Sequence, residues 1–179
     1  EVRPYECDGL PAYRQLPQAV VLPRTEAELK AVLEACRRHR VPVVARGAGT
    51  GLSGGAMPHA EGIVVALARF MKILEIDPAA RVARVQPGVR NLALSEAAAP
   101  FNLYYAPDPS SQIACTLGGN VAENSGGVHC LKYGLTVHNV LAVRALVLSE
   151  EGVDEVVFGS KAPDSPGLDL LAPLVGSEG

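Results

Sequence analysis

The chain has 179 residues, of which 20% are charged and 4% aromatic, and its formal net charge at pH 7 is −3. This length allows a sizeable buried core, while the weakly acidic balance and the few aromatic side chains argue against a nucleic-acid partner. The apolar runs are no longer than a strand and no basic-then-apolar leader is visible, so we expect no integral membrane segment and a cytoplasmic location.

The first expected elements are a strand, a helix and a second strand. Residues 1–17 are expected to be irregular, and Ala19–Leu22 forms a short apolar strand. Thr25 and Glu28 have the spacing of a capping box, and apolar residues at helical spacing follow them, so a helix begins at Thr25. Its basic C-terminal end is best explained as a solvated helix terminus, with an anion-binding patch as the alternative. Pro42–Ala45 is the next expected strand.

The segment Arg46–Gly55 places five glycines in ten residues directly after that strand. Glycine forgoes side-chain burial, so this density indicates positive φ angles or a ligand that lies against the main chain. The N–H groups of such a turn form a nest for phosphate, to which Arg46 would add charge and Thr50 a hydroxyl. A flexible surface turn is the alternative, but the apolar Ala48 and Leu52 are unusual in a free linker.

The string Gly49–Gly54 also matches the G-x-G-x-x-G pattern of nicotinamide-binding folds. In those folds a helix follows the glycines, and the diphosphate lies at its N-terminus. Here Pro58 and Gly62 interrupt the following residues, and Ile63–Leu67 is expected to be another buried strand. The sequence therefore predicts a strand, a phosphate nest and a strand, and it disfavours the nicotinamide dinucleotide fold.

A hairpin and a second helix are expected next. Lys72–Asp77 and Arg81–Gln86 alternate apolar and polar residues around a turn, as in a half-exposed hairpin. Val89–Ala99 is rich in alanine and leucine and is followed by Pro100, so a helix is expected there.

A second stretch of small polar residues covers Pro107–Gln112 and Thr116–Gly127. It has too few large apolar groups to form a core, so we expect it to present N–H, hydroxyl and amide groups to a polar ligand. Its two Gly-Gly pairs would allow two backbone turns to approach a flat ligand closely. A tight structural loop is the alternative, but two such stretches in one chain favour a ligand held from two sides.

The C-terminal part is expected to contain a second hairpin, formed by Val140–Leu148 and Val153–Phe158. A loop over residues 159–166, a short helical segment over Leu168–Val175 and a glycine-rich turn at Gly176–Gly179 follow. No closing element follows that turn, so we expect the chain to be truncated there.

The four cysteines are too widely spaced for a redox pair or a zinc ribbon, and free thiols are expected. They are Cys7, Cys36, Cys115 and Cys130. His129 and His138 lie near Cys130, but a histidine beside a cysteine is more often structural than a ligand, so we expect no metal site.

Four motifs in order resemble the FAD-binding (PCMH-type) region of the vanillyl-alcohol oxidase and para-cresol methylhydroxylase family. Within that family the resemblance is closest to the FAD-binding subunits of glycolate oxidase and the FAD-linked D-2-hydroxyacid dehydrogenases, and it includes Tyr5–Leu10. The motifs are P-V-V-A-R-G-A-G-T-G-L-S-G-G (Pro42–Gly55), Y-Y-A-P-D-P-S-S (Tyr104–Ser111), G-G-N-V-A-E-N-S-G-G-V-H-C-L-K-Y-G (Gly118–Gly134) and G-S-E-G (Gly176–Gly179). The resemblance covers essentially the whole chain.

The resemblance implies an α+β fold of two α/β lobes with FAD between them. We expect residues 1–100 to form the first lobe and residues 101–179 the second, which would be incomplete and lack the substrate cap. Thr50 stands where some relatives carry the histidine that attaches the flavin, so FAD is expected to be non-covalent. The residues implied to bind FAD are Arg46, Gly47, Ala48, Gly49, Thr50, Gly51, Leu52, Pro107, Asp108, Ser111, Thr116, Gly118, Gly119, Asn120, Asn124, Gly126 and Gly127.

The implied activity is the oxidation of a small 2-hydroxyacid, of the glycolate or D-lactate type, by hydride transfer to the flavin. Partner subunits of an oxidase complex are also implied. The family's catalytic histidine lies in a C-terminal segment that residues 1–179 do not contain, so no residue here is assigned as the catalytic base. Two alternatives are a non-catalytic flavin-binding or electron-transfer subunit, and an amino-sugar nucleotide reductase of the same architecture.

Overall fold

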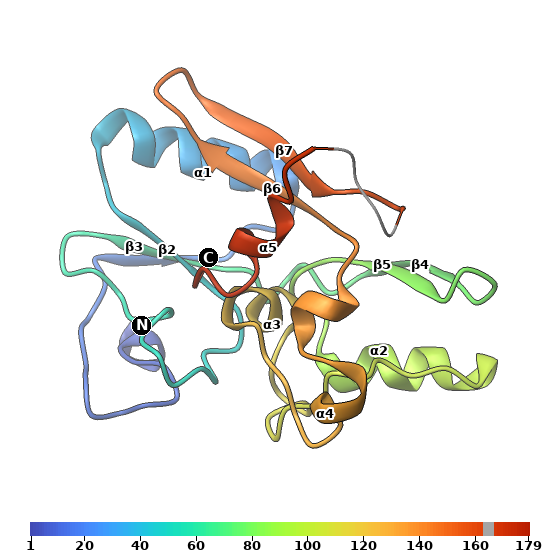
Figure 1. The fold of residues 1–179 in the computed structure, drawn as a ribbon. Coiled ribbons are helices and arrows are strands. Elements are labelled where there is room, and N and C mark those ends of the chain that lie inside the picture. Colours follow the sequence, from blue (N-terminus) through green and yellow to red (C-terminus); the bar gives the residue numbers. More distant parts are fainter. Residues whose placement is uncertain (163–166) are drawn as a thin grey trace.

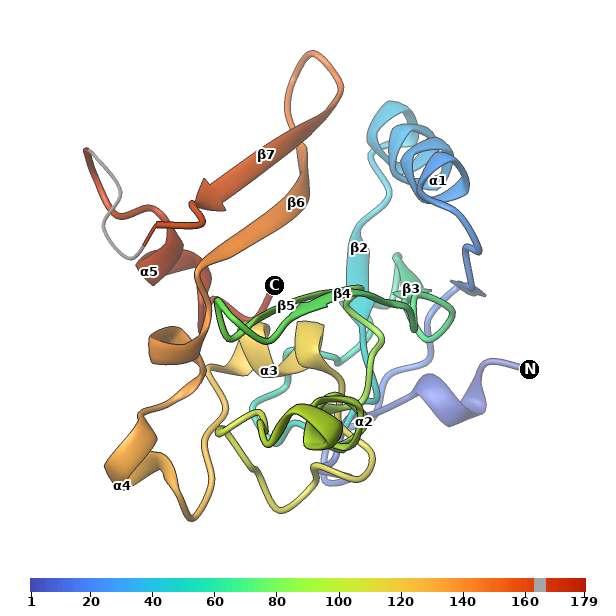
Figure 2. The same ribbon diagram turned by 90° about the vertical axis from the view of Figure 1, so that its right-hand side faces the viewer.

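The computed structural model describes residues 1–162 and 167–179. Among these residues, three small sheets are joined by helices and long connections, which gives a mixed α/β architecture (Figure 1). Helix α1 and the hairpin β6–β7 lie at one end of the molecule, and α2 and α4 lie at the other (Figure 2). Residues 163–166, part of the loop expected over 159–166, lie outside the described residues. Within the described ranges no helix is long and apolar enough to cross a bilayer.

The first sheet contains three parallel strands in the order β1 (Ala19–Val21), β3 (Ile63–Ala66) and β2 (Val43–Arg46). The central strand β3 is the most buried, and Val64 is 0% exposed. A continuous apolar run is what a parallel strand covered on both faces requires. The segment between β2 and β3 contains no helix, as the sequence predicts.

Helix α1 (Glu26–His39) connects β1 to β2 and buries Leu33 and Cys36. The Thr25 hydroxyl accepts the Glu28 N–H at 3.1 Å and so caps the helix as expected. The Glu28 carboxylate accepts the N–H of Arg24 at 2.7 Å rather than that of Thr25, so the return half of the capping box is shifted by one residue.

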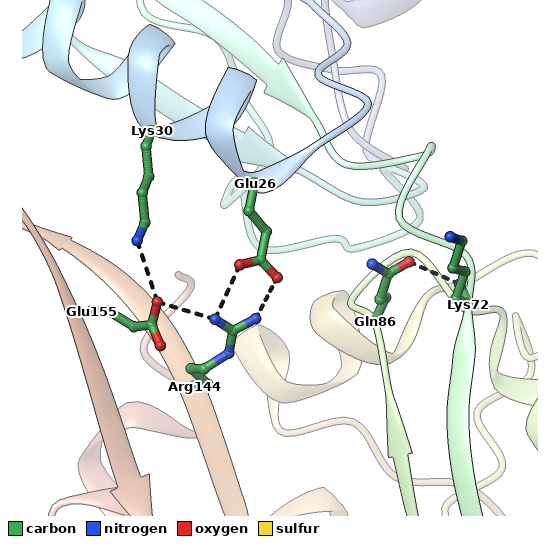
Figure 3. Close-up of polar contacts among 6 residues, drawn as sticks. All are labelled: Glu26, Lys30, Lys72, Gln86, Arg144 and Glu155. Atoms are coloured by element: carbon green, nitrogen blue, oxygen red, sulfur yellow. Dashed lines mark hydrogen bonds and ion pairs between the residues drawn. The ribbon is translucent and has the colours of Figure 1, made fainter.

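The second sheet is the antiparallel hairpin β4 (Ile73–Asp77) and β5 (Val82–Val85). The Lys72 N–H extends it by donating to Gln86 Oε1 at 3.0 Å (Figure 3). Helix α2 (Asn91–Ala98) follows and continues into a 3₁₀ turn. The β4–β5 hairpin and helix α2 share a small hydrophobic core. Its buried residues are Val89, Leu94 and Leu117, and Ile73, Ala83, Val85 and Tyr105 pack against them.

The polar stretch after residue 115 is more ordered than the sequence predicts, because it contains helix α3 (Leu117–Glu123). The Thr116 hydroxyl caps this helix by accepting the Gly119 N–H at 3.4 Å. The pair Gly118–Gly119, expected in a backbone turn, therefore lies inside a helix. Capping by Thr116 and the burial of Leu117 outweigh the low helix propensity of two glycines. A short helix, α4 (Cys130–Tyr133), follows.

The third sheet is the antiparallel hairpin β6 (Ala142–Leu148) and β7 (Val153–Gly159), which α5 (Leu171–Leu174) follows. The last residues return to α3, where the N–H groups of Gly176 and Glu178 donate to the carbonyls of Val121 and Ala122, each at 2.8 Å.

Charged residues join this hairpin to α1 (Figure 3). Arg144 of β6 pairs with Glu26 of α1, and it also pairs with Glu155 of β7 at 3.1 Å. Glu155 accepts a further bond from Lys30 of α1 at 3.3 Å. The hydrogen bonds from Arg144 lower the pKa of the Glu26 carboxyl. Together, these ion pairs connect the half of the chain before residue 100 to the half after it.

Candidate functional site

The two glycine-rich stretches predicted from the sequence lie against each other. The main chain of Gly47 packs on the Thr116 side chain so closely that a methyl group on Gly47 would overlap the Thr116 hydroxyl. Further along the same loop, Gly51 packs on the Glu123 carboxylate, and the Ser53 hydroxyl donates to Glu123 Oε2 at 3.1 Å. The first glycine loop (residues 46–55) therefore lies along helix α3, although about seventy positions separate them in the sequence.

Positive φ angles explain part of the glycine density in the first loop. Gly49 has φ +69° and Gly54 has φ +87°, a region that side chains with a Cβ rarely occupy. The Gly54 carbonyl accepts the Met57 N–H at 2.9 Å and closes a turn. The loop is thus an ordered series of turns, in agreement with the prediction that it is not a free linker.

Arg46 lies at the buried side of this loop and is 7% exposed. Its Nη1 donates to the carbonyl of Cys7 at 2.7 Å and to that of Ala56 at 3.2 Å. The guanidinium also lies 5.5 Å from the centre of the Tyr5 ring and directly beneath Gly49. Burial lowers the pKa of the Arg46 guanidinium. The sequence predicts that Arg46 adds charge beside the phosphate, whereas its hydrogen bonds in the structure go to main-chain carbonyls.

The predicted residues Asp108 and Gly127 form a second contact group. Gly127 packs directly on the main chain of Asp108, where a side chain would not fit. The Asp108 carboxylate pairs with His129, at 2.5 Å to Nδ1 and 3.3 Å to the main-chain N–H. Burial alone would raise the pKa of the Asp108 carboxyl, but the hydrogen bonds from His129 outweigh it and lower that pKa. The sequence does not predict this pairing, because two residues separated by 21 positions give no periodic signal.

Two buried asparagines carry polar atoms without a well-aligned hydrogen bond among the described residues. Asn120, in helix α3, is 1% exposed; its carboxamide interacts with the Cys115 thiol, but neither of its polar atoms has a well-aligned hydrogen bond. Asn91 donates to the Pro107 carbonyl at 2.9 Å, but its Oδ1 has no partner. A buried polar atom without a hydrogen bond costs about 1–3 kcal/mol, so this region is built for more polar contacts than the chain itself makes.

Four other predicted residues have structural roles that the contacts define. Asn124 Oδ1 accepts the Val137 N–H at 3.0 Å. The Ser111 carbonyl accepts the N–H groups of Ala114 and Cys115, each at 2.8 Å. Gly118 faces Pro87 and Gly126 faces Leu135, so these two glycines are required by packing between elements.

A cavity of about 140 Å³ lies between β4 and α2. It is smaller than the roughly 300–1,000 Å³ typical of ligand pockets. None of the residues predicted to bind FAD lines it; the lining residues are Met71, Ile73, Gly88, Val89, Arg90 and Ala93. Within residues 1–162 and 167–179, no group of three or more His, Cys, Asp or Glu side chains is arranged to hold a metal ion.

The chain is similar to several known proteins. The chain is 64% identical over 179 residues to the glycolate oxidase subunit GlcD of Escherichia coli (strain K12), which covers 100% of this chain and 35% of that protein. It is 41% identical over 160 residues to a D-lactate dehydrogenase of Archaeoglobus fulgidus, covering 89% of this chain and 35% of that protein. A solved structure of the glycopeptide hexose oxidase DBV29 complexed with teicoplanin shares the fold, with a TM-score of 0.80 at 16% identity over 97% of this chain and 34% of that one.

The chain thus spans about a third of the length of the curated relatives that it matches. The expected α+β fold of the PCMH type is confirmed. The sequence profile of the FAD binding domain family matches residues 17–152, which is most of the chain. The chain therefore belongs to the FAD binding domain family.

Proposed function

We propose that this chain is the FAD-binding part of a flavin-dependent oxidoreductase that oxidises a small 2-hydroxyacid of the glycolate or D-lactate type. The similarity to a glycolate oxidase subunit and to a D-lactate dehydrogenase supports the reaction class. The observation that carries the proposal is the contact of the first glycine loop with helix α3 through Gly47 and Thr116, since it brings two glycine-rich surfaces to one place.

The residues present fit a dinucleotide flavin. In the first loop, Gly49 has a positive φ angle and no side chain, which would allow a diphosphate to lie against the main chain. Near α3, the carboxamide of Asn120, which lacks a well-aligned hydrogen bond, marks a buried region short of polar partners. When bound, FAD supplies the hydride acceptor of the reaction. The chain's own part is to bind and orient the cofactor, non-covalently, with residues 1–100 and residues 101–179 as the two lobes around it.

The remaining parts of the proposal follow from the relatives. One relative is named as a subunit of glycolate oxidase, so partner subunits are proposed here as well. A cytoplasmic location stays a prediction from the sequence. We assign no catalytic base within residues 1–179.

The test is to express the protein from its natural reading frame, load it with FAD and record the visible spectrum before and after adding glycolate or D-lactate without oxygen. Bleaching of the flavin band by either acid supports the proposal. Bound FAD that neither acid reduces supports a non-catalytic flavin subunit, and reduction by NADPH alone supports a reductase. Absence of FAD binding would overturn the proposal altogether.

A variant of the first glycine loop links that result to the geometry. Gly49→Val places a branched side chain at φ +69° and against the Arg46 guanidinium, so FAD affinity should fall strongly. Gly152→Ala is the matched control, because nothing lies within 4 Å of a Cβ at that position. Equal FAD affinity in the two variants would show that the first loop is not the diphosphate site.

A further inference from the structure

The N-terminal segment Tyr5–Gly9, called the strap below, lies across the first glycine loop. Its contacts come from four of its five residues. The Tyr5 ring and the Cys7 carbonyl both contact the guanidinium of Arg46, and the carboxylate of Asp8 and the N–H of Gly9 contact the loop main chain. The family profile begins at residue 17, so the strap lies outside the matched domain.

Asp8 ties the strap to the loop at a buried position, since it is only 7% exposed. Its Oδ2 accepts the Gly54 N–H at 2.8 Å, and its Oδ1 accepts the Leu10 N–H at the same distance. Hydrogen bonds to an ionised carboxylate are roughly twice as strong as neutral ones. One side chain therefore fixes both the turn that ends the strap and the far end of the glycine loop.

Gly9 brings the two main chains into direct contact. Its N–H donates to the Gly51 carbonyl at 2.8 Å. A Cβ on Gly9 would lie 2.8 Å from the Thr50 carbonyl oxygen and 2.9 Å from that of Gly51. Both of these atoms belong to the main chain, so no side chain can swing away to make room. Thr50 and Gly51 are among the residues predicted to bind the diphosphate.

These contacts fix the direction of two carbonyl groups, one in the loop and one directly after it. The carbonyl of Gly51 is held by the Gly9 N–H, and the carbonyl of Ala56 is held by the Arg46 guanidinium. A nest for an anion needs its N–H groups directed at the ligand and its carbonyl oxygens directed elsewhere, because the oxygens repel phosphate. The strap and Arg46 occupy the side toward which these oxygens are directed.

We propose that the strap is part of the flavin site, with Asp8 as a positioning residue that keeps the first glycine loop in the shape that binds the diphosphate of FAD. This proposal rests on the proposed function. The hydrogen bonds of Asp8 are with the main-chain N–H groups of Leu10 and Gly54, so it would act through the main chain of the loop.

The test compares Asp8→Ala, Asp8→Asn and Gly9→Ala in the protein expressed from its natural reading frame. Affinities for FAD and for riboflavin, which lacks the diphosphate, are measured by quenching of flavin fluorescence. We expect Asp8→Ala to lose about tenfold in FAD affinity, as for a charge-assisted hydrogen bond, with riboflavin affinity unchanged. Asp8→Asn should lose less, because the asparagine oxygen still accepts one of the two N–H groups. Gly9→Ala should lose at least as much as Asp8→Ala.

Arg14→Ala is the matched control, since Arg14 pairs with the Glu6 side chain of the strap at 2.6 Å on the surface, and its hydrogen bonds among the described residues go to Glu6 and Pro11. If the wild-type protein binds FAD and the Asp8 and Gly9 variants bind it as well as Arg14→Ala does, the inference is wrong. Equal losses for FAD and riboflavin would reduce the strap to general structural support and would also overturn it. If Asp8→Ala does not fold, Asp8→Asn and Gly9→Ala decide by the same criteria. A wild-type protein that binds no FAD would overturn the proposed function itself.

Discussion

The contact between Gly47 and Thr116 can be tested by adding a single methyl group. In Gly47→Ala the new Cβ overlaps Thr116 Oγ1, so the hydroxyl must rotate or the loop must move by about 1 Å. Rotation removes the cap of helix α3, which costs about 1 kcal/mol, and overpacking costs about 1–3 kcal/mol. We expect Gly47→Ala to lower the free energy of unfolding by about 1–3 kcal/mol and FAD affinity by about tenfold.

A double-mutant cycle isolates this contact, with the free energy of unfolding measured by urea titration. Without Oγ1, the nearest atoms to a Cβ on Gly47 are Thr116 Cβ at 3.7 Å and Gly119 N at 3.8 Å, both ordinary contacts. The cost of Gly47→Ala with Thr116→Ala should therefore be smaller than the sum of the single costs by about 1 kcal/mol. Gly152→Ala, the open-space control, should stay within about 0.5 kcal/mol of wild type. Additive costs would mean that the loop does not rest on Thr116, and the geometry of the site would have to be abandoned.

Three further predictions concern the supporting structure. Burial raises the pKa of Tyr105 to about 12, above its unfolded value of about 10. The stabilisation from the neutral phenol is therefore complete below about pH 10, and the free energy of unfolding falls by up to about 3 kcal/mol as the pH rises to 12. Urea titrations of Tyr105→Phe should show a smaller alkaline loss of stability, and an equal loss would contradict the raised pKa of Tyr105. Arg144→Met removes the ion pairs of Arg144 with Glu26 and Glu155. Because these pairs are partly exposed, the free energy of unfolding should fall by about 0.5–1 kcal/mol in dilute buffer and by less at high salt. A loss that does not depend on salt would contradict an ionic role. Gly88→Ala places a Cβ 2.5 Å and 2.8 Å from two main-chain oxygens. Calorimetry should therefore show that the free energy of unfolding falls by about 2 kcal/mol or more. An unchanged melting temperature would refute this close packing around Gly88.

The strands were predictable because their patterns are local. The continuous apolar run of β3 (Ile63–Ala66) indicates a strand buried on both faces, and the alternation in β4 and β5 indicates a hairpin with one wet face. The rejection of a nicotinamide-type fold was also correct, since Pro58 and Gly62 leave no room for a helix between β2 and β3. In each case a few neighbouring residues contain the whole signal.

Helix α3 was missed for the opposite reason. Gly118 and Gly119 have low helix propensity, and their small neighbours give a weak apolar pattern, so local rules favour a loop. The helix forms because Leu117 joins the core beside Val89 and Leu94, residues about 25 positions earlier in the chain. Propensity is a weak prior that tertiary burial overrides, and no window of the sequence around the helix contains that core.

Arg46 shows why the chemistry of a site is harder to predict than its location. The sequence places an arginine beside a phosphate nest, and attraction between the two charges is the simplest expectation. A buried arginine at the end of a strand has another solution, which is to satisfy main-chain carbonyls that would otherwise lack donors, and Arg46 donates to those of Cys7 and Ala56. The bond to Cys7 exists because the chain 39 positions earlier returns to the loop. If the strap does position the loop, the charge of Arg46 serves the flavin through the shape of the main chain, and removing Asp8 should weaken FAD binding even though Arg46 remains in place.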